Sequence, residues 1–188
     1  APVYEKCFGS FTYDASSPKV NEEHLYDIAS LTKTTGTLLA VMKLYDEGKF
    51  GLTDPISKYV PAMKGSRKGK ITIEDLLYHQ SGLPGSWPFY REAINDSSYT
   101  GGFFKGRIDA NHHLRVDRRL YVVDDFKYKE EYLSGVRAEA YPLQVSENLF
   151  GSPDFPKRML EMIASDEIPL RDRRYRYSCL NFVLLKEM

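Results

Sequence analysis

The sequence has few cysteines and no excess of charge of either sign. Cys7 and Cys179 are its two cysteines and lie far apart, so neither a disulfide framework nor a CxxC zinc pattern is present. Lys plus Arg (26) balance Asp plus Glu (26), which argues against nucleic-acid and anionic-membrane partners. No run of about 18 apolar residues occurs, which excludes a membrane-spanning helix. The chain is nevertheless 42% hydrophobic and, at 188 residues, long enough to bury a sizeable core.

The N-terminal part predicts one strand and one long helix. Residues 3–13 are strand-forming around a glycine and lead into a turn over 14–18. The longest helix is expected over 29–48, since Gly48 suits the position after a helix and apolar side chains recur at roughly helical spacing: Leu31, Leu38, Leu39, Met42 and Tyr45. Asp27 or Ser30 could cap its start.

Shorter elements are expected further along the chain. Asp54-Pro55 suits the start of a short helix, and Thr72-x-x-Asp75 is a capping pattern that predicts another. Residues 87–144 are polar and carry one strand-like run, 120–123. Residues 146–164 are expected to be partly helical and 180–188 to form the last helix. No internal repeat is evident, and a start in a strand with a stop in a helix suggests a chain cut from something longer.

One pair of residues has the spacing of an activated nucleophile. Ser30-Leu31-Thr32-Lys33 is an S-x-x-K sequence at the start of the longest expected helix. Residues three apart share a helix face, so the Lys33 amine can reach the Ser30 hydroxyl. The positive end of the helix dipole favours an alkoxide and lowers the pKa of a neighbouring lysine. Lys33 could therefore accept the serine proton.

The spacing alone is weak, because roughly one S-x-x-K is expected by chance in a chain of this composition. A second copy, Ser16-Ser17-Pro18-Lys19, lies in a proline-containing turn where no helix aligns the two side chains. The plain alternative for Ser30 is a helix cap followed by an exposed lysine.

Three segments together resemble a known family. Residues 26–56, which contain the Ser30-x-x-Lys33 pair, closely resemble the penicillin-recognising serine hydrolases, in particular the branch of class C β-lactamases, DD-peptidases and family VIII esterases. Residues 76–84, LLYHQSGLP, resemble that branch's LLxHxSGLP signature, and 177–185, YSCLNFVLL, resemble its YSNxGYxLLG element. The resemblance covers 21–84 and 171–188, with the three elements in family order.

The resemblance implies an α+β, β-lactamase/transpeptidase-like fold: an antiparallel sheet flanked by helices, plus a mostly helical lobe. It implies acylation of Ser30, with Lys33 as proton partner, Tyr177 sharing proton transfer with the lysine and the leaving group, and the Ser30 N–H as one oxyanion donor. The expected substrate is a β-lactam, a D-alanyl peptide or an ester, small or peptidoglycan-like. No metal or organic cofactor is implied, and the expected location is periplasmic or secreted.

Two features depart from the family pattern. Cys179 stands where Asn or Asp is usual, and a thiol is a poor hydrogen-bonding substitute for an amide. The family's K-T-G or H-x-G strand is absent after Tyr177, and no helix precedes the first expected strand. We therefore expect residues 1–188 to form a single partial domain. The alternatives are a catalytically silent relative that binds through the same cleft, or a structural fragment that needs the missing strands.

Other candidates have simpler explanations. Cys179 has no nearby histidine to activate it and is expected to be a half-buried structural thiol. His79 belongs to the signature but is expected to tie down the loop after its helix. His112-His113 lie near several aspartates but lack a metal-ligand spacing, so solvated loop histidines are expected. The arginines at 115–119 and 171–176 are expected to form solvated faces.

Overall fold

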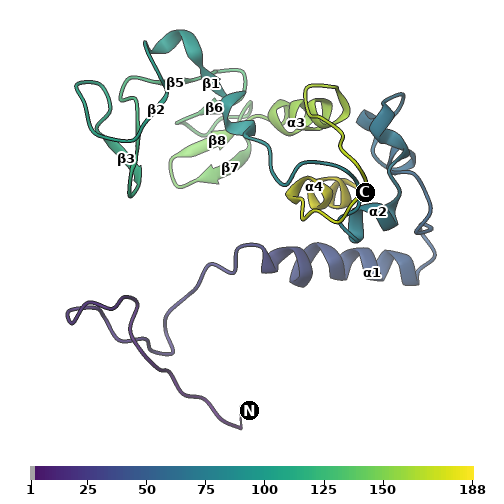
Figure 1. Ribbon diagram of the computed structural model, residues 1–188, viewed down its shortest axis with the longest axis horizontal. Helices are drawn as coiled ribbons and strands as arrows, with labels where there is room; N and C mark the ends of the chain where they lie inside the picture. Colours follow the sequence, from purple (N-terminus) through teal and green to yellow (C-terminus); the bar gives the residue numbers. More distant parts are fainter. Residues whose placement is uncertain (1–2) are drawn as a thin grey trace. The chain divides into compact units, whose positions relative to one another are not determined.

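The computed structural model describes residues 3–188 and divides into two compact units, Ala1–Ala40 and Val41–Met188. In residues 3–30 of the first unit, the backbone forms turns and one isolated bridge, Ser10 to Lys19 (Figure 1). The strand expected over 3–13 is therefore wrong. After the turn, this segment can pair only with the residues that immediately follow it. An isolated pair of strands has marginal stability unless further strands or a helix pack against it.

The expected long helix forms, but it begins later and in a different geometry. A π-helical segment, Lys33–Leu38, continues into α1, Leu39–Asp46. Ala29 has φ 44°, a left-handed conformation that cannot belong to a right-handed helix. Neither expected cap is used, because the Asp27 carboxylate accepts the Ala29 N–H over 2.7 Å instead. Gly48 ends the helix as expected, with φ 67°.

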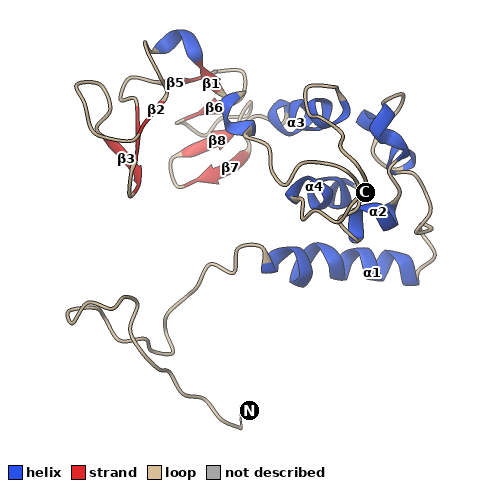
Figure 2. Ribbon diagram, viewed as in Figure 1, coloured by secondary structure: helices blue, strands red, loops and turns tan. Residues whose placement is uncertain are grey.

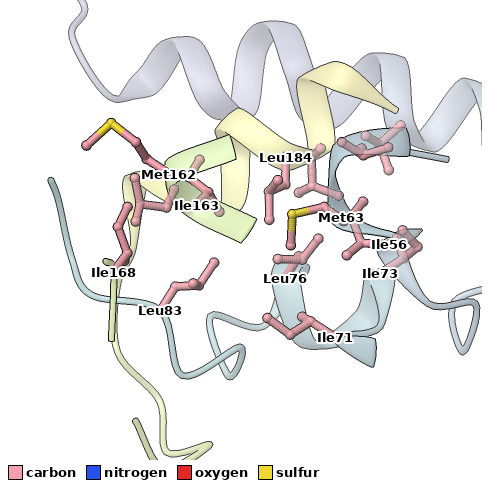
Figure 3. Close-up of a cluster of buried hydrophobic side chains, with 14 of the residues drawn as sticks. Ile56, Met63, Ile71, Ile73, Leu76, Leu83, Met162, Ile163, Ile168 and Leu184 are labelled. Atoms are coloured by element: carbon pink, nitrogen blue, oxygen red, sulfur yellow. The ribbon is translucent and has the colours of Figure 1, made fainter. Parts of the chain in front are cut away.

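The core of the second unit is built mostly from helices and 3₁₀ turns (Figure 3). Its helices are the part of α1 from Val41 onward, α2 (Ile73–Leu77), α3 (Asp154–Ala164) and α4 (Cys179–Glu187). They are joined by 3₁₀ turns at Ile56–Lys58, Pro61–Met63 and Arg67–Lys70. Their side chains interdigitate, and several are fully buried: Ile56, Met63, Ile73, Leu76, Ile163 and Leu184. The short helices at 56 and 72 and the last helix are confirmed.

The Thr72 prediction is confirmed in detail. The Thr72 hydroxyl accepts the Asp75 N–H over 3.1 Å, and the Asp75 carboxylate accepts the Thr72 N–H over 3.0 Å. This reciprocal capping box satisfies two of the free donors at the start of α2. It fixes the helix that leads directly into the His79 loop.

The strands form three small antiparallel sheets rather than one sheet flanked by helices (Figure 2). The α+β class is confirmed, and the strand-like run at 120–123 is β4. The sheets are β1 (Ile94–Asn95) with β5 (Lys127–Tyr128); β2 (Phe104–Lys105), β4 (Leu120–Val122) and β3 (Leu114–Asp117); and β6 (Leu133–Ser134), β8 (Leu149–Gly151) and β7 (Leu143–Ser146).

The two three-stranded sheets are copies of one another, so the expectation of no internal repeat is wrong. Their strand order, pairing register and bulge position all recur 29 residues later: Phe104 pairs with Val122 as Leu133 pairs with Gly151. The repeat is hidden in the sequence because few positions are identical, among them Gly106 and Gly135, Val116 and Val145, and Leu120 and Leu149.

Candidate active site

The structure brings Ser30 and Lys33 together. The Lys33 Nζ donates a hydrogen bond to the Ser30 Oγ over 3.2 Å. Tight turns before the helix create this geometry, since the Leu31 N–H donates to the Ile28 carbonyl and the Thr32 N–H to the Ala29 carbonyl. Ser30 is exposed at the start of the helix, and Lys33 is half-buried one turn later. A serine hydroxyl in contact with an amine is the arrangement that nucleophilic catalysis requires.

The π-helical segment begins at Lys33 itself. The Leu31 carbonyl accepts the hydroxyls of Thr34 and Thr35 over 2.8 and 3.0 Å. Within residues 3–188, no backbone carbonyl accepts the Ser30 N–H, which leaves that donor available at the helix N-terminus. A backbone N–H at this place suits a developing oxyanion. Segments of π-helix are rare and are often found at functional sites.

The second S-x-x-K has no such geometry. Ser16 lies in a turn, and across the described part of the chain no hydrogen bond joins it to Lys19. The proline between them prevents the helical spacing that aligns Ser30 with Lys33. Of the two S-x-x-K sequences, therefore, Ser30-x-x-Lys33 has its side chains in contact and Ser16-x-x-Lys19 does not, as predicted from the sequence.

Tyr177 lies in the second unit, in the extended segment that precedes α4. Its side chain is 43% exposed, and its ring packs against the His79 ring with centroids 4.8 Å apart. The neighbouring backbone is fixed on both sides: the Arg176 N–H donates to the His79 carbonyl and the Cys179 N–H to the Gly85 carbonyl, both over 2.8 Å. The ring of Tyr177 is thus held on a well-anchored strand-like segment.

His79 is the centre of the network that anchors Tyr177, in agreement with the structural role expected for it. Its φ of 56° turns the chain sharply after α2. Its Nδ1 lies 3.2 Å from the Ser178 N–H and 3.1 Å from Nδ2 of Asn181. Both partners donate, so Nδ1 must accept, and in the neutral ring the proton is on Nε2.

Asn181 and Ser178 are positioning residues for which no role was expected from the sequence. Asn181 is fully buried; its Nδ2 also donates to the Leu76 carbonyl over 3.0 Å, and its Oδ1 accepts the Ser81 hydroxyl over 2.6 Å. The Ser178 hydroxyl donates to the Pro84 carbonyl over 2.6 Å. The signal was available, because Ser81, Ser178 and Asn181 all lie within the two quoted motifs, and buried polar side chains need partners.

The three proposed catalytic residues are therefore found in two places. Ser30 and Lys33 are in contact within the first unit, whereas Tyr177 belongs to the second, and its meeting with Ser30 stays a prediction. Cys179 is a half-buried free thiol at the first position of α4, as expected. The four arginines between 171 and 176 are exposed, also as expected.

The histidine pair at 112–113 is not simply solvated. His112 is 3% exposed, with Nδ1 2.7 Å from Asp109 and Nε2 2.7 Å from the Gly102 carbonyl. The bond to the Gly102 carbonyl and then the Asp109 carboxylate raise the pKa of His112. His113 is exposed and pairs with Asp124. In residues 3–188 no three His, Cys, Asp or Glu side chains are arranged to hold a metal ion.

Comparison with known proteins gives the chain its family. The beta-lactamase family profile matches residues 1–121, which include Ser30 and Lys33 but not Tyr177. No solved structure matches, and no helix among residues 3–188 has the length and apolar character needed to cross a membrane.

Curated relatives are similar over part of the chain. A protein of Escherichia coli K12 named "Putative D-alanyl-D-alanine carboxypeptidase" is 37% identical over 110 residues, covering 52% of this chain and 25% of that protein. An N-acetylmuramyl-L-alanine amidase of Bacillus subtilis 168 is 37% identical over 78 residues, covering 38% of this chain and 18% of that protein. The chain thus spans about a quarter or less of the length of these relatives. Because the family profile covers well over half of the residues, the chain belongs to the beta-lactamase family.

Proposed function

We propose that the chain is a serine acyl-transfer hydrolase in which Ser30 is the nucleophile, Lys33 its proton partner and Tyr177 a second proton-transfer group. The observation that carries the proposal is the 3.2 Å hydrogen bond between Lys33 Nζ and Ser30 Oγ. Family membership supports the same chemistry. The substrate would be a β-lactam, a D-alanyl peptide or an ester.

The proposed reaction has two steps. In the first, the Ser30 Oγ bonds to the substrate carbonyl carbon while its proton moves to the unprotonated Lys33 amine, and the Ser30 N–H donates to the oxyanion. The bond to the leaving group then breaks, and the leaving group takes up a proton delivered through Lys33 and Tyr177. In the second, water attacks the acyl-serine, which releases the acid and returns the proton to Ser30.

The names of the relatives favour cell-wall chemistry among these substrates. The name "Putative D-alanyl-D-alanine carboxypeptidase" refers to a D-alanyl-D-alanine substrate, and "N-acetylmuramyl-L-alanine amidase" to an N-acetylmuramyl-L-alanine amide. We therefore include a peptidoglycan-like acyl substrate and a periplasmic or secreted location in the proposal. Both rest on the resemblance and on these names.

Cys179 favours a second candidate, a relative that is acylated or binds ligand without turnover. The half-buried thiol at the start of α4 replaces the amide or carboxylate usual at this position of the motif. Such a protein would bind the same carbonyl compounds but would release them slowly or leave them intact.

The experiment is to incubate the chain with a fluorescent penicillin, a p-nitrophenyl ester and a D-alanyl-D-alanine peptide, and to follow both covalent labelling and product release. The Ser30→Ala variant is the control. Labelling with turnover, lost in the variant, supports the hydrolase, whereas labelling without turnover supports the second candidate. Product release that persists in Ser30→Ala would contradict the assignment of the nucleophile.

A further inference from the structure

A cavity of about 900 Å³ lies where the two repeated sheets meet, within the second unit. Both copies of the repeat contribute equivalent positions to its wall. Four pairs of positions 29 residues apart line it: Phe104 and Leu133, Val116 and Val145, Leu120 and Leu149, and Phe126 and Phe155. The cavity is therefore a consequence of the repeat and is formed without Ser30, Lys33 or Tyr177.

The wall has the composition of a binding site for an apolar ligand. Aromatic rings form much of it, with Phe103 packed against Phe104 at 4.7 Å and against Phe126 at 5.3 Å between centroids. The volume falls in the range of small-molecule sites and far exceeds the voids left between packed side chains. Leu114 and Val116, both about half exposed, lie on edge strand β3, so the wall also faces solvent.

One charged side chain, Arg115, lines the cavity. Its Nε donates to the Asp117 carbonyl over 3.1 Å and its Nη2 to the Arg118 carbonyl over 3.4 Å, which holds the guanidinium in place and leaves Nη1 for another acceptor. Arg118 and Arg119 follow on the same turn. Together with Asp117 these residues belong to the segment around the β3–β4 turn, which adjoins the cavity at Leu120 and has a net positive charge.

The corresponding segment of the second repeat has no net positive charge. Gln144, Glu147 and Asn148 occupy the positions of Arg115, Arg118 and Arg119. An apolar cavity whose one charged lining residue is a cation complements a long apolar molecule with a single anionic end.

We propose that this cavity binds a free long-chain fatty acid, with its hydrocarbon chain between the two repeats and its carboxylate at Arg115. The apolar wall removes the chain from water, and the fixed guanidinium orients the carboxylate. The site is independent of the proposed hydrolase chemistry.

The test is a fluorescence titration of the full chain, in its Ser30→Ala form, with cis-parinaric acid and with hexadecanoic acid as competitor. The repeat supplies a matched pair of variants, because Leu114 lines the cavity whereas its equivalent, Leu143, does not. Both are partly exposed, at 49% and 43%, so glutamate is tolerated at either. We expect Leu114→Glu to weaken binding at least about tenfold and Leu143→Glu to change it less than about twofold.

The charge is tested separately by Arg115→Gln, which places in the first repeat the residue that the second repeat already has. We expect this variant to weaken binding of the acid about tenfold and to leave binding of methyl hexadecanoate unchanged. No saturable binding, equal losses in Leu114→Glu and Leu143→Glu, or an unaltered affinity for the acid in Arg115→Gln would each overturn the proposal. Circular dichroism and cooperative thermal unfolding verify that each variant is folded.

Discussion

Lys33 donates a hydrogen bond from its Nζ to the Oγ of Ser30 over 3.2 Å. The left-handed Ala29 immediately before the serine and the π-helical segment that begins at the lysine set the positions of the two side chains. Such sparsely populated backbone geometry costs free energy and is concentrated at functional sites. The pair therefore differs from an ordinary exposed serine and lysine that happen to be three residues apart.

Replacing Lys33 with methionine should slow acylation of Ser30. The variant keeps much of the side-chain length but removes the amine that accepts the proton, and loss of a general base typically costs about 10²- to 10⁴-fold in rate. The measurement is the rate constant for labelling by a p-nitrophenyl ester or a fluorescent penicillin. Lys19→Met, in the second S-x-x-K, is the matched control, and an equal effect of both variants would count against the assigned base.

Replacing Asn181 with alanine should destabilise the second unit. The change removes the acceptor of the Ser81 hydroxyl and one of the donors to the Leu76 carbonyl and to the His79 ring, and each lost buried hydrogen-bonding partner costs about 1–3 kcal/mol. We expect a loss of about 3 kcal/mol or more in the free energy of unfolding, measured in urea. The exposed Asn148→Ala should change it by less than about 0.5 kcal/mol. A comparably small loss in Asn181→Ala would mean that the His79 network does not anchor this region.

Replacing Gly82 with alanine should be more costly than the same change at Gly101. Both glycines have left-handed backbones, with φ 80° and 84°, so both variants carry that penalty of about 1–2 kcal/mol. Only at Gly82 would the added Cβ also meet a backbone atom, the Arg171 carbonyl oxygen at 2.4 Å. This overpacking adds about 1–3 kcal/mol. Thermal unfolding of the two variants should show the difference, and equal shifts would be inconsistent with the close approach of the 82 and 171 segments.

The first repeat should lose stability as the solution becomes alkaline. The hydrogen bonds from the His112 ring to the Gly102 carbonyl and to the Asp109 carboxylate raise the pKa of His112 above its ordinary value. The nearby positive charge of Lys105 acts in the opposite direction. Protonation therefore favours the folded state below about pH 6.5, and this contribution is lost as pH rises through the folded-state value. The difference in unfolding temperature between the wild type and His112→Gln should be larger at pH 5.5 than at pH 9.

The comparison with Asp109→Asn isolates the carboxylate. Without this charge, the part of the pH dependence of the unfolding temperature that is due to His112 should become shallower. It should not disappear, because the Gly102 carbonyl still accepts a hydrogen bond from the ring. A pH dependence that is identical in Asp109→Asn and the wild type would show that the ion pair with His112 is not formed in solution.

The sequence predicted best where local rules decide the structure. The Thr72–Asp75 capping box, the glycine after α1 and the last helix depend on residues within one turn of each other, and all are confirmed. The Ser30–Lys33 contact is local in the same sense. It needs only the start of a helix, which the serine and the apolar periodicity already indicate.

The remaining features depend on partners distant in the chain. Residues 3–13 are strand-forming, but a strand needs a neighbour, and the described part of the first unit supplies only one isolated bridge. The two repeated sheets share their strand register but few identical residues. Phe104 and Leu133, for example, hold equivalent positions in the two sheets although they are different amino acids. The buried His112 ring donates to the carbonyl of Gly102, ten residues earlier in the chain. The polar sequence around His112 does not indicate this contact.

Whether Ser30 is the activated nucleophile is tested most simply by treating the chain with a fluorophosphonate, measuring its intact mass and mapping the modified residue. We expect one adduct, on Ser30, that persists in Ser16→Ala and disappears in Ser30→Ala. An adduct on another residue, or equal labelling of Ser16 and Ser30, would contradict the assignment of Ser30 as the activated nucleophile. So would the absence of any adduct on a cooperatively folded chain.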